Sequence, residues 1–254
     1  MIETSVKSYS RAVGIFLILT MFGGFFGEVY VPSQMSGADA AARIAQLRTH
    51  EDLFRVGFAG YMVEAFSDVV LAWLFYVLLR PVHRDLALLS AFFGIISMTL
   101  FAATQMFYFT APMFLGGSRY LAHFSGQELE GLASAFLSIS GYLSGVFMLF
   151  YGSAWIVRGY LTFKSGYLPR FLGLLMLVAG AGFVAQNITK VLAPAYSSSM
   201  LLAPMFLNVV VLAIWMLTKG VNRDKWHKAL RAEGDRLGAD ANRQPPSERQ
   251  QHET

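Results

Sequence analysis

The 254-residue chain is strongly apolar: 55% of its residues are hydrophobic, 14% are charged, and the mean hydropathy is +0.49. Soluble domains carry about 25% charged residues, so this composition excludes an ordinary soluble protein. The absence of cysteine excludes disulfides, thiolate metal sites and cysteine nucleophiles. The net charge of +4 does not indicate nucleic acid as a partner, because the basic residues flank the apolar stretches.

Six apolar stretches have the length that a membrane-spanning helix needs, which is about 20 residues. They predict an all-α integral membrane protein, a six-transmembrane-helix bundle in the lipid bilayer, formed by residues 1–221. The predicted spans are residues 12–31, 56–79, 86–109, 129–157, 171–192 and 201–217.

The start of the first span has the order of a secretory signal, because Lys7 and Arg11 precede the apolar run. The run is long, however, and no small-residue cleavage signature follows it, so we expect a retained span. Pro32 is predicted to end this helix, and residues 36–47 to form a short helix at the membrane surface.

The fourth span is predicted to begin at a capping box, in which Ser125 precedes Glu128 by three residues. Residues 222–254 are predicted to form a charged tail. Its first part, residues 223–237, could extend the last helix along the membrane surface, and residues from about Gly238 are expected to be disordered.

The orientation follows from the distribution of lysine and arginine, which are enriched in cytoplasmic connections. Fifteen of them fall on the side that holds both termini and five on the other side, with Arg158 counted in a loop beyond the fourth span. Both termini are therefore predicted to be cytoplasmic, in a multi-pass protein of the cell inner membrane.

Glu64 and Asp68 are the ionisable residues nearest to the middle of a span. They are four residues apart, so they share one helix face, with Gly57, Gly60 and Ser67 on or near it. A charge at this depth costs about 2.5 to 3.5 kcal/mol, and two neighbouring acids are not both expected to be charged. They are candidates for ligand binding or proton transfer; the alternative is that they only hydrogen-bond neighbouring helices.

Other polar residues fall at a similar depth when the helices are laid side by side, and together they suggest a polar pocket open to the outside. These further candidates are Glu28, Gln105, Gln186, Asn187, Lys190 and Asn208. Each amide could equally serve helix packing. Glu28 could be an ordinary interfacial acid, and Lys190 could pair with Glu28 or Glu64 or extend to the interface.

The fourth span carries small residues at helical spacing, Ser134, Ser138, Gly141 and Gly145, which predict close packing against another helix. No histidine pair has metal-ligand spacing on one helix, and no phosphate-binding or dinucleotide motif occurs. The sequence therefore predicts no metal and no cofactor.

The segments GEVYVPSQM, LFRVGF and LFYVLLRPVHRDLALLS, between Gly27 and Ser90, resemble a bacterial membrane-protein family known as domain of unknown function 4386. YLPRFLGLL and IWMLTKGV resemble it too, so the similarity extends to about Val221. The resemblance implies a six-helix inner-membrane protein and supplies no activity or cofactor. Where the family pattern often has an arginine in span three and a glutamate before the last apolar run, this chain has Gly94 and Asn208.

Three functions are compatible with these residues. The first is binding or moving a small solute or lipid through an outward-facing polar pocket with Glu64 as the key acid, in a monomer or homodimer. The second is a membrane-embedded enzyme that uses Glu64 and Asp68 as acid and base on a lipid-like substrate. The third is an accessory subunit of another membrane protein, held by the small residues of the fourth span and by the basic tail.

Overall fold

The computed structural model describes residues 6–34, 46, 49–115, 121–196 and 198–243, and in these ranges the chain is helical with short connections. Six helices are long and apolar enough to cross a membrane, which confirms the predicted all-α fold with six spans. The surface helix predicted for residues 36–47 lies almost entirely outside the described residues.

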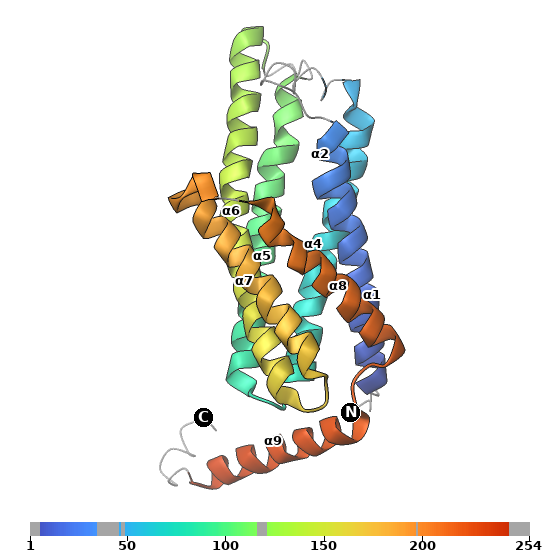
Figure 1. Cartoon of the computed structure of the whole chain (residues 1–254). Helices are drawn as coiled ribbons and strands as arrows, with labels where there is room; N and C mark the ends of the chain where they lie inside the picture. The colour runs from blue at the N-terminus through green and yellow to red at the C-terminus, as the bar shows by residue number, and fades with distance from the viewer. Residues whose placement is uncertain (1–5, 35–45, 47–48, 116–120, 197, 244–254) are drawn as a thin grey trace, which may run out of the picture.

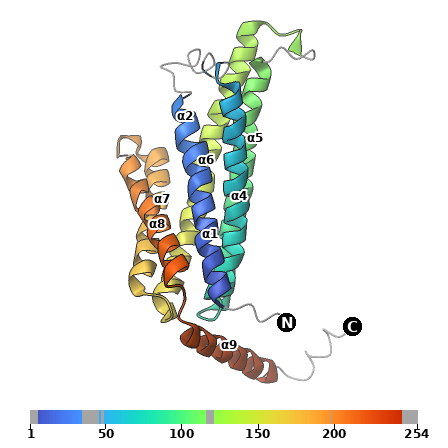
Figure 2. The same ribbon diagram turned by 90° about the vertical axis from the view of Figure 1, so that its right-hand side faces the viewer.

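The spanning helices form a closed ring in chain order, because each packs against the next and the last returns to the first (Figures 1 and 2). They are α1 (Val6–Gly24), α4 (Glu51–Leu79), α5 (Arg84–Thr110), α6 (Gly126–Ser165), α7 (Arg170–Leu192) and α8 (Ala203–Thr218). The short helices are η1 (Phe25–Tyr30), α2 (Val31–Gln34), η2 (Ala111–Leu115), η4 (Pro194–Tyr196) and η5 (Ser199–Leu202).

The first helix does not stop at Pro32 as predicted. It passes from α1 into η1, a six-residue π-helix, and then into α2. Pro32 is the second residue of α2 and follows η1 directly. Val31 N–H still donates to Phe26 O in η1, so the helix continues across the proline.

The longest helix, α6, has 40 residues, so at about 1.5 Å per residue it is longer than the bilayer core is thick. Its first turn is closed by the predicted capping box, since Ser125 N donates to Glu128 Oε2 (2.7 Å) and Glu128 N donates to Ser125 Oγ (3.3 Å). The predicted end at Val157 is wrong, because the helix continues to Ser165 and keeps Arg158 inside the bundle.

Glycines hold α6 and α7 together at two levels. A Cβ on Gly152 would lie 2.8 Å from Gly180 O, and a Cβ on Gly159 would lie 2.8 Å from Gly173 O. Gly152 and Gly159 are seven residues apart on α6, and Gly173 and Gly180 are seven residues apart on α7. Seven residues are about two helical turns, so the two contacts fit an antiparallel crossing. Only glycine allows the backbones to approach this closely.

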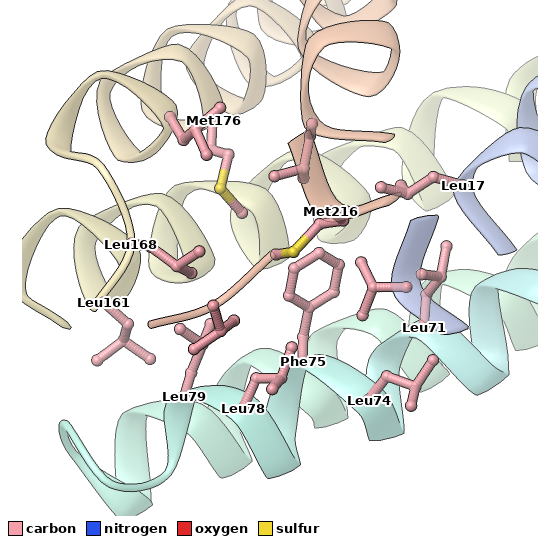
Figure 3. Packing of buried hydrophobic residues seen from close by; sticks show 14 of the residues in the cluster. Leu17, Leu71, Leu74, Phe75, Leu78, Leu79, Leu161, Leu168, Met176 and Met216 are labelled. Atoms are coloured by element: carbon pink, nitrogen blue, oxygen red, sulfur yellow. The ribbon is translucent and has the colours of Figure 1, made fainter. Parts of the chain in front are cut away.

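The main hydrophobic core fills the half of the bundle nearer to the start of α1. The side chains labelled in Figure 3 come from five of the spanning helices and the loop after α6. They are Leu17 from α1, Leu71, Leu74, Phe75, Leu78 and Leu79 from α4, Leu161 from α6, Leu168 from the loop, Met176 from α7 and Met216 from α8. All these side chains are fully or almost fully buried. The core therefore seals this end of the ring.

The predicted tail contains a further helix, α9 (Arg223–Arg243), which crosses the sealed end of the bundle (Figures 1 and 2). It does not extend α8, because Gly220 adopts a positive φ of 68° and turns the chain. Trp226 Nε1 donates to Leu78 O (3.1 Å), and Arg80 lies 3.9 Å from Glu233. The expectation of disorder from about Gly238 is wrong up to Arg243, and residues 244–254 lie outside the described ranges.

Candidate functional site

A cavity of about 90 Å³ lies directly beyond the hydrophobic core, in the half of the ring away from α9. This volume is large enough to hold several water molecules. All six spanning helices contribute to its wall. The lining residues are Thr20, Met21, Gly24, Phe25, Glu28, Val29, Glu64, Asp68, Met98, Phe101, Phe147, Met148, Tyr151, Phe183, Met205, Phe206 and Val209.

Three carboxylates meet at this cavity, Glu28 from η1 and Glu64 and Asp68 from α4. They lie near enough for each to feel the charge of another. The spacing of four residues on α4 brings Glu64 and Asp68 to the same wall, as the helical period requires. The remaining wall is mostly methionine and phenylalanine, so the pocket combines acids with an apolar surface.

The Glu64 carboxylate lies against the backbone of α1 where that helix has two glycines. A Cβ on Gly24 would lie 2.9 Å from Glu64 Oε1, and a Cβ on Gly23 would lie 2.7 Å from Gly60 O. Gly60, one of the small residues predicted beside Glu64, thus faces α1, and the glycines of the two helices bring α1 and α4 close together. Glu64 Oε2 is buried and has no hydrogen-bond partner among the described residues.

Glu28 reaches the cavity from the π-helix η1. A π-helix has hydrogen bonds from residue i to i+5, so it changes the register of all following side chains. Such segments are frequent at functional sites. Glu28 itself is exposed at the edge of the cavity, whereas Asp68 lies deep inside it.

Two polar side chains at the inner end of the cavity are buried without a hydrogen-bond partner in the described part of the chain. Asp68 is 4% exposed and Thr20 is 6% exposed, and Asp68 Oδ1 and Thr20 Oγ1 are both unpaired. An unsatisfied buried polar group costs about 1 to 3 kcal/mol. Both side chains line the cavity, so the unpaired atoms are positioned to meet a bound molecule.

Arg158 provides the positive charge beneath these acids. It is 2% exposed, its Nε donates to Ser90 Oγ (3.1 Å), and its guanidinium lies 4.9 Å from the centre of the Phe75 ring. A Cβ on Gly94 would lie 2.8 Å from Arg158 Nη2, so this glycine makes room for the guanidinium. Arg158 and Asp68 interact electrostatically but form no direct salt bridge in the described ranges.

The other predicted site residues do not line the cavity. Gln105 is buried beside Tyr61, and Asn187 Nδ2 donates to Phe183 O within its own helix (2.9 Å). Gln186 Oε1 accepts from Ser198 N (3.1 Å), which ties α7 to the following loop. Asn208 is fully buried and its Nδ2 contacts Met205 Sδ at 3.9 Å.

Lys190 is exposed, and in the described part of the chain it forms no salt bridge with Glu28 or Glu64. Of the eight predicted residues, the structure thus gathers Glu28, Glu64 and Asp68 at one cavity and places the five others elsewhere.

Sequence reasoning missed Arg158, Thr20 and Tyr151 as parts of this site. The charge of Arg158 suggests the end of a span, but the apolar residues Tyr160, Leu161 and Phe163 that follow it indicate a continuing helix. For Thr20 and Tyr151 the sequence holds no comparable signal, since single hydroxyl groups are common in membrane helices.

The exposed apolar residues of the cavity wall lie on η1 and α8, which indicates a sideways opening between these two helices. Phe25, Val29 and Phe206 belong to its wall and are also 55%, 44% and 54% exposed on the outside of the ring. The apolar outer face of a membrane bundle contacts lipid tails. The mouth therefore faces the hydrocarbon part of the bilayer.

Comparison with known proteins gives a family match for this architecture. The family described as "Domain of unknown function (DUF4386)" matches residues 12–220. The chain belongs to this family. The match covers the six spans and ends just before α9, so α9 lies outside the matched region.

A relative described as "Uncharacterized protein", from Archaeoglobus fulgidus, is 28% identical over 155 residues. These residues make up 60% of this chain and 76% of the relative. No solved structure matches the chain.

Proposed function

We propose that this protein is a bacterial inner-membrane protein that binds or moves a small solute or a lipid-like molecule in the cavity between α1, α4 and α8. The observation that supports this function best is the convergence of Glu28, Glu64 and Asp68 on one cavity from two different helices. A carboxylate at membrane depth costs about 2.5 to 3.5 kcal/mol even on the lenient scale. Glu64 and Asp68 lie near the middle of a span, so a purely structural role would not explain why this cost is tolerated.

The shape of the cavity supports entry from the lipid. The hydrophobic core closes the ring toward α9, while the mouth opens sideways between η1 and α8. A molecule with an apolar part can therefore reach the acids without crossing water. Glu64 is the proposed key acid, because its Oε2 is buried, unpaired in the described ranges and directed to the cavity wall.

Native mass spectrometry of protein released from lipid nanodiscs tests this proposal. We expect a discrete small-molecule adduct on the wild type that is lost in Glu64→Gln. The matched control is Asp52→Asn, which makes the same acid-to-amide change on an exposed position of the same helix and should keep the adduct. An adduct that survives Glu64→Gln, or its absence from the folded wild type, would contradict the proposal.

A second candidate, an accessory subunit of another membrane protein, is supported by the small-residue stripe of α6. The helical spacing of the small residues Ser134, Ser138, Gly141 and Gly145 predicts close packing against another helix. Ser138 and Gly141 are instead exposed, and a Cβ on Gly141 would meet nothing within 4 Å. Gly141→Leu should then release a stoichiometric partner that co-purifies with the wild type in mild detergent; if the wild type carries no partner, this candidate fails.

A further inference from the structure

The charge balance of the cavity points to the chemical class of its ligand. Three of the 17 lining residues are acids, and none of them is lysine, arginine or histidine. Arg158, which interacts electrostatically with Asp68, is not among the lining residues; it donates to Ser90 and packs over Phe75 and Trp155. Even when one of the neighbouring acids is neutral, two carboxylates exceed the single positive charge of Arg158, which leaves room for a further cation at the cavity.

The uncharged lining favours an organic cation over a metal ion. Calcium and magnesium need six or more oxygen ligands at about 2.0 to 2.6 Å, whereas most of this wall consists of methionine and phenylalanine side chains. Ammonium groups bind well to aromatic faces, here those of Phe101, Phe147 and Phe183. Methionine adds an adaptable apolar surface, which occurs in sites that accept varied ligands.

The unpaired hydrogen-bond acceptors favour an ammonium ion that still carries protons. Asp68 Oδ1 and Thr20 Oγ1 are both more than nine-tenths buried, line the cavity and have no partner among the described residues. A primary ammonium offers three N–H donors, as the lysine side chain does. Thr20 lies close to Asp68 and adds a hydroxyl group to the carboxylates at the inner end of the cavity.

The sideways mouth determines what can be attached to the ammonium. Phe25, Val29 and Phe206 line the mouth and face the lipid. A cavity of about 90 Å³ accepts a small head group but not a long chain. A chain attached to that head group would leave through the mouth and lie among the lipid tails.

We propose that the ligand of this cavity is a single-chain amphiphilic amine, bound with its ammonium group between Glu28, Glu64 and Asp68 and its alkyl chain in the mouth between η1 and α8. This inference rests on the proposed binding function and adds the charge and shape of the ligand.

The test compares three probes with the same chain length: decylamine, which is a cation at pH 7, the neutral 1-decanol and the anion decanoate. Wild-type protein in nanodiscs is incubated with each probe, and occupancy is measured by native mass spectrometry at equal probe concentration in the lipid. We expect decylamine to bind at least about tenfold more tightly than decanol, which corresponds to about 1.4 kcal/mol. Decanoate should not bind.

Two variants link this preference to the acids. In Glu28→Gln/Glu64→Gln the preference for decylamine over decanol should fall to about twofold or less, whereas Asp52→Asn should keep it. The comparison of probes on the wild type remains decisive if the double variant fails to fold.

The outcomes separate the two proposals. If decanol or decanoate binds as well as decylamine and Glu64→Gln weakens that binding, the ammonium inference is overturned and the proposed binding function stands. A co-purified adduct that is neutral or anionic would likewise overturn the ammonium inference and leave the proposed binding function standing. If no probe and no co-purified molecule binds the folded wild type, both proposals are overturned.

Discussion

Arg158 donates its Nε–H to Ser90 Oγ at 3.1 Å, across the contact between α6 and α5 and inside the membrane region. Ser90 Oγ in turn donates to Ala154 O at 3.4 Å, so the serine connects the arginine to the backbone of α6. A buried arginine needs such partners, because an unpaired charge in an apolar interior is strongly unfavourable. The arrangement ties the candidate site to the core beneath it.

Arg158→Ala should destabilise the protein by about 3 to 5 kcal/mol, because it removes the positive charge beneath Asp68 and leaves Ser90 without its donor. The unfolding midpoint in detergent measures this change. Lys164→Ala, on an exposed position of the same helix, should change stability by less than about 0.5 kcal/mol. Similar midpoints for the two variants would show that Arg158 does not act as a buried counter-charge.

Thr20→Val should separate stability from ligand binding. The substitution keeps the side-chain shape and removes the unpaired hydroxyl, so the ligand-free protein should gain up to about 1 kcal/mol. Stabilisation by added decylamine should decrease, because the ligand loses an acceptor. Thermal unfolding with and without decylamine measures both effects. Thr99→Val is the control, since Thr99 Oγ1 already donates to Ile95 O (3.0 Å) outside the cavity; equal behaviour of the two variants would contradict this role for Thr20.

Gly152→Ala should destabilise the α6–α7 pair by about 1 to 3 kcal/mol, because the new Cβ would lie 2.8 Å from Gly180 O and force the helices apart. Gly141→Ala, on the same helix with nothing within 4 Å, should be neutral or stabilising by up to about 1 kcal/mol. The two unfolding midpoints provide the comparison. If both substitutions stabilise, the close approach at Gly152 does not determine the packing.

Tyr167 should make the docking of α9 sensitive to alkaline pH. Its hydroxyl donates to Leu78 O (2.6 Å), and burial, together with the nearby Glu233 carboxylate, raises the pKa of Tyr167 above its ordinary value of 10.0. Above about pH 10 the unfolded chain therefore binds fewer protons than the folded one, so this contribution to stability falls as the pH rises. Wild type should lose stability above pH 10 more steeply than Tyr167→Phe, measured as unfolding midpoints between pH 7 and 11. An equal loss of stability above pH 10 in the wild type and in Tyr167→Phe would argue against this role for Tyr167.

The orientation can be tested with introduced cysteines, because the natural chain has none. Moving Arg158 into the bundle leaves fourteen lysines and arginines on the side of α9 and five on the other side, so α9 is still predicted to be cytoplasmic. A membrane-impermeant maleimide should label Asp52→Cys in intact cells, and His227→Cys only after permeabilisation. The reverse pattern would invert the proposed topology.

The sequence by itself determined the six spans, the capping box at Ser125 and the depth of Glu64 and Asp68. These features depend on local hydrophobicity, on helix-end hydrogen bonds and on the period of a single helix, all of which can be read along the chain. The tertiary structure decided that Glu28 joins Glu64 and Asp68 through a π-helix, that Arg158 lies beneath them, and that Lys190 and the amides lie elsewhere. Whether a charged side chain can remain buried depends on partners from distant segments, such as Ser90 and Gly94 for Arg158, and only the packing of the helices brings those partners together.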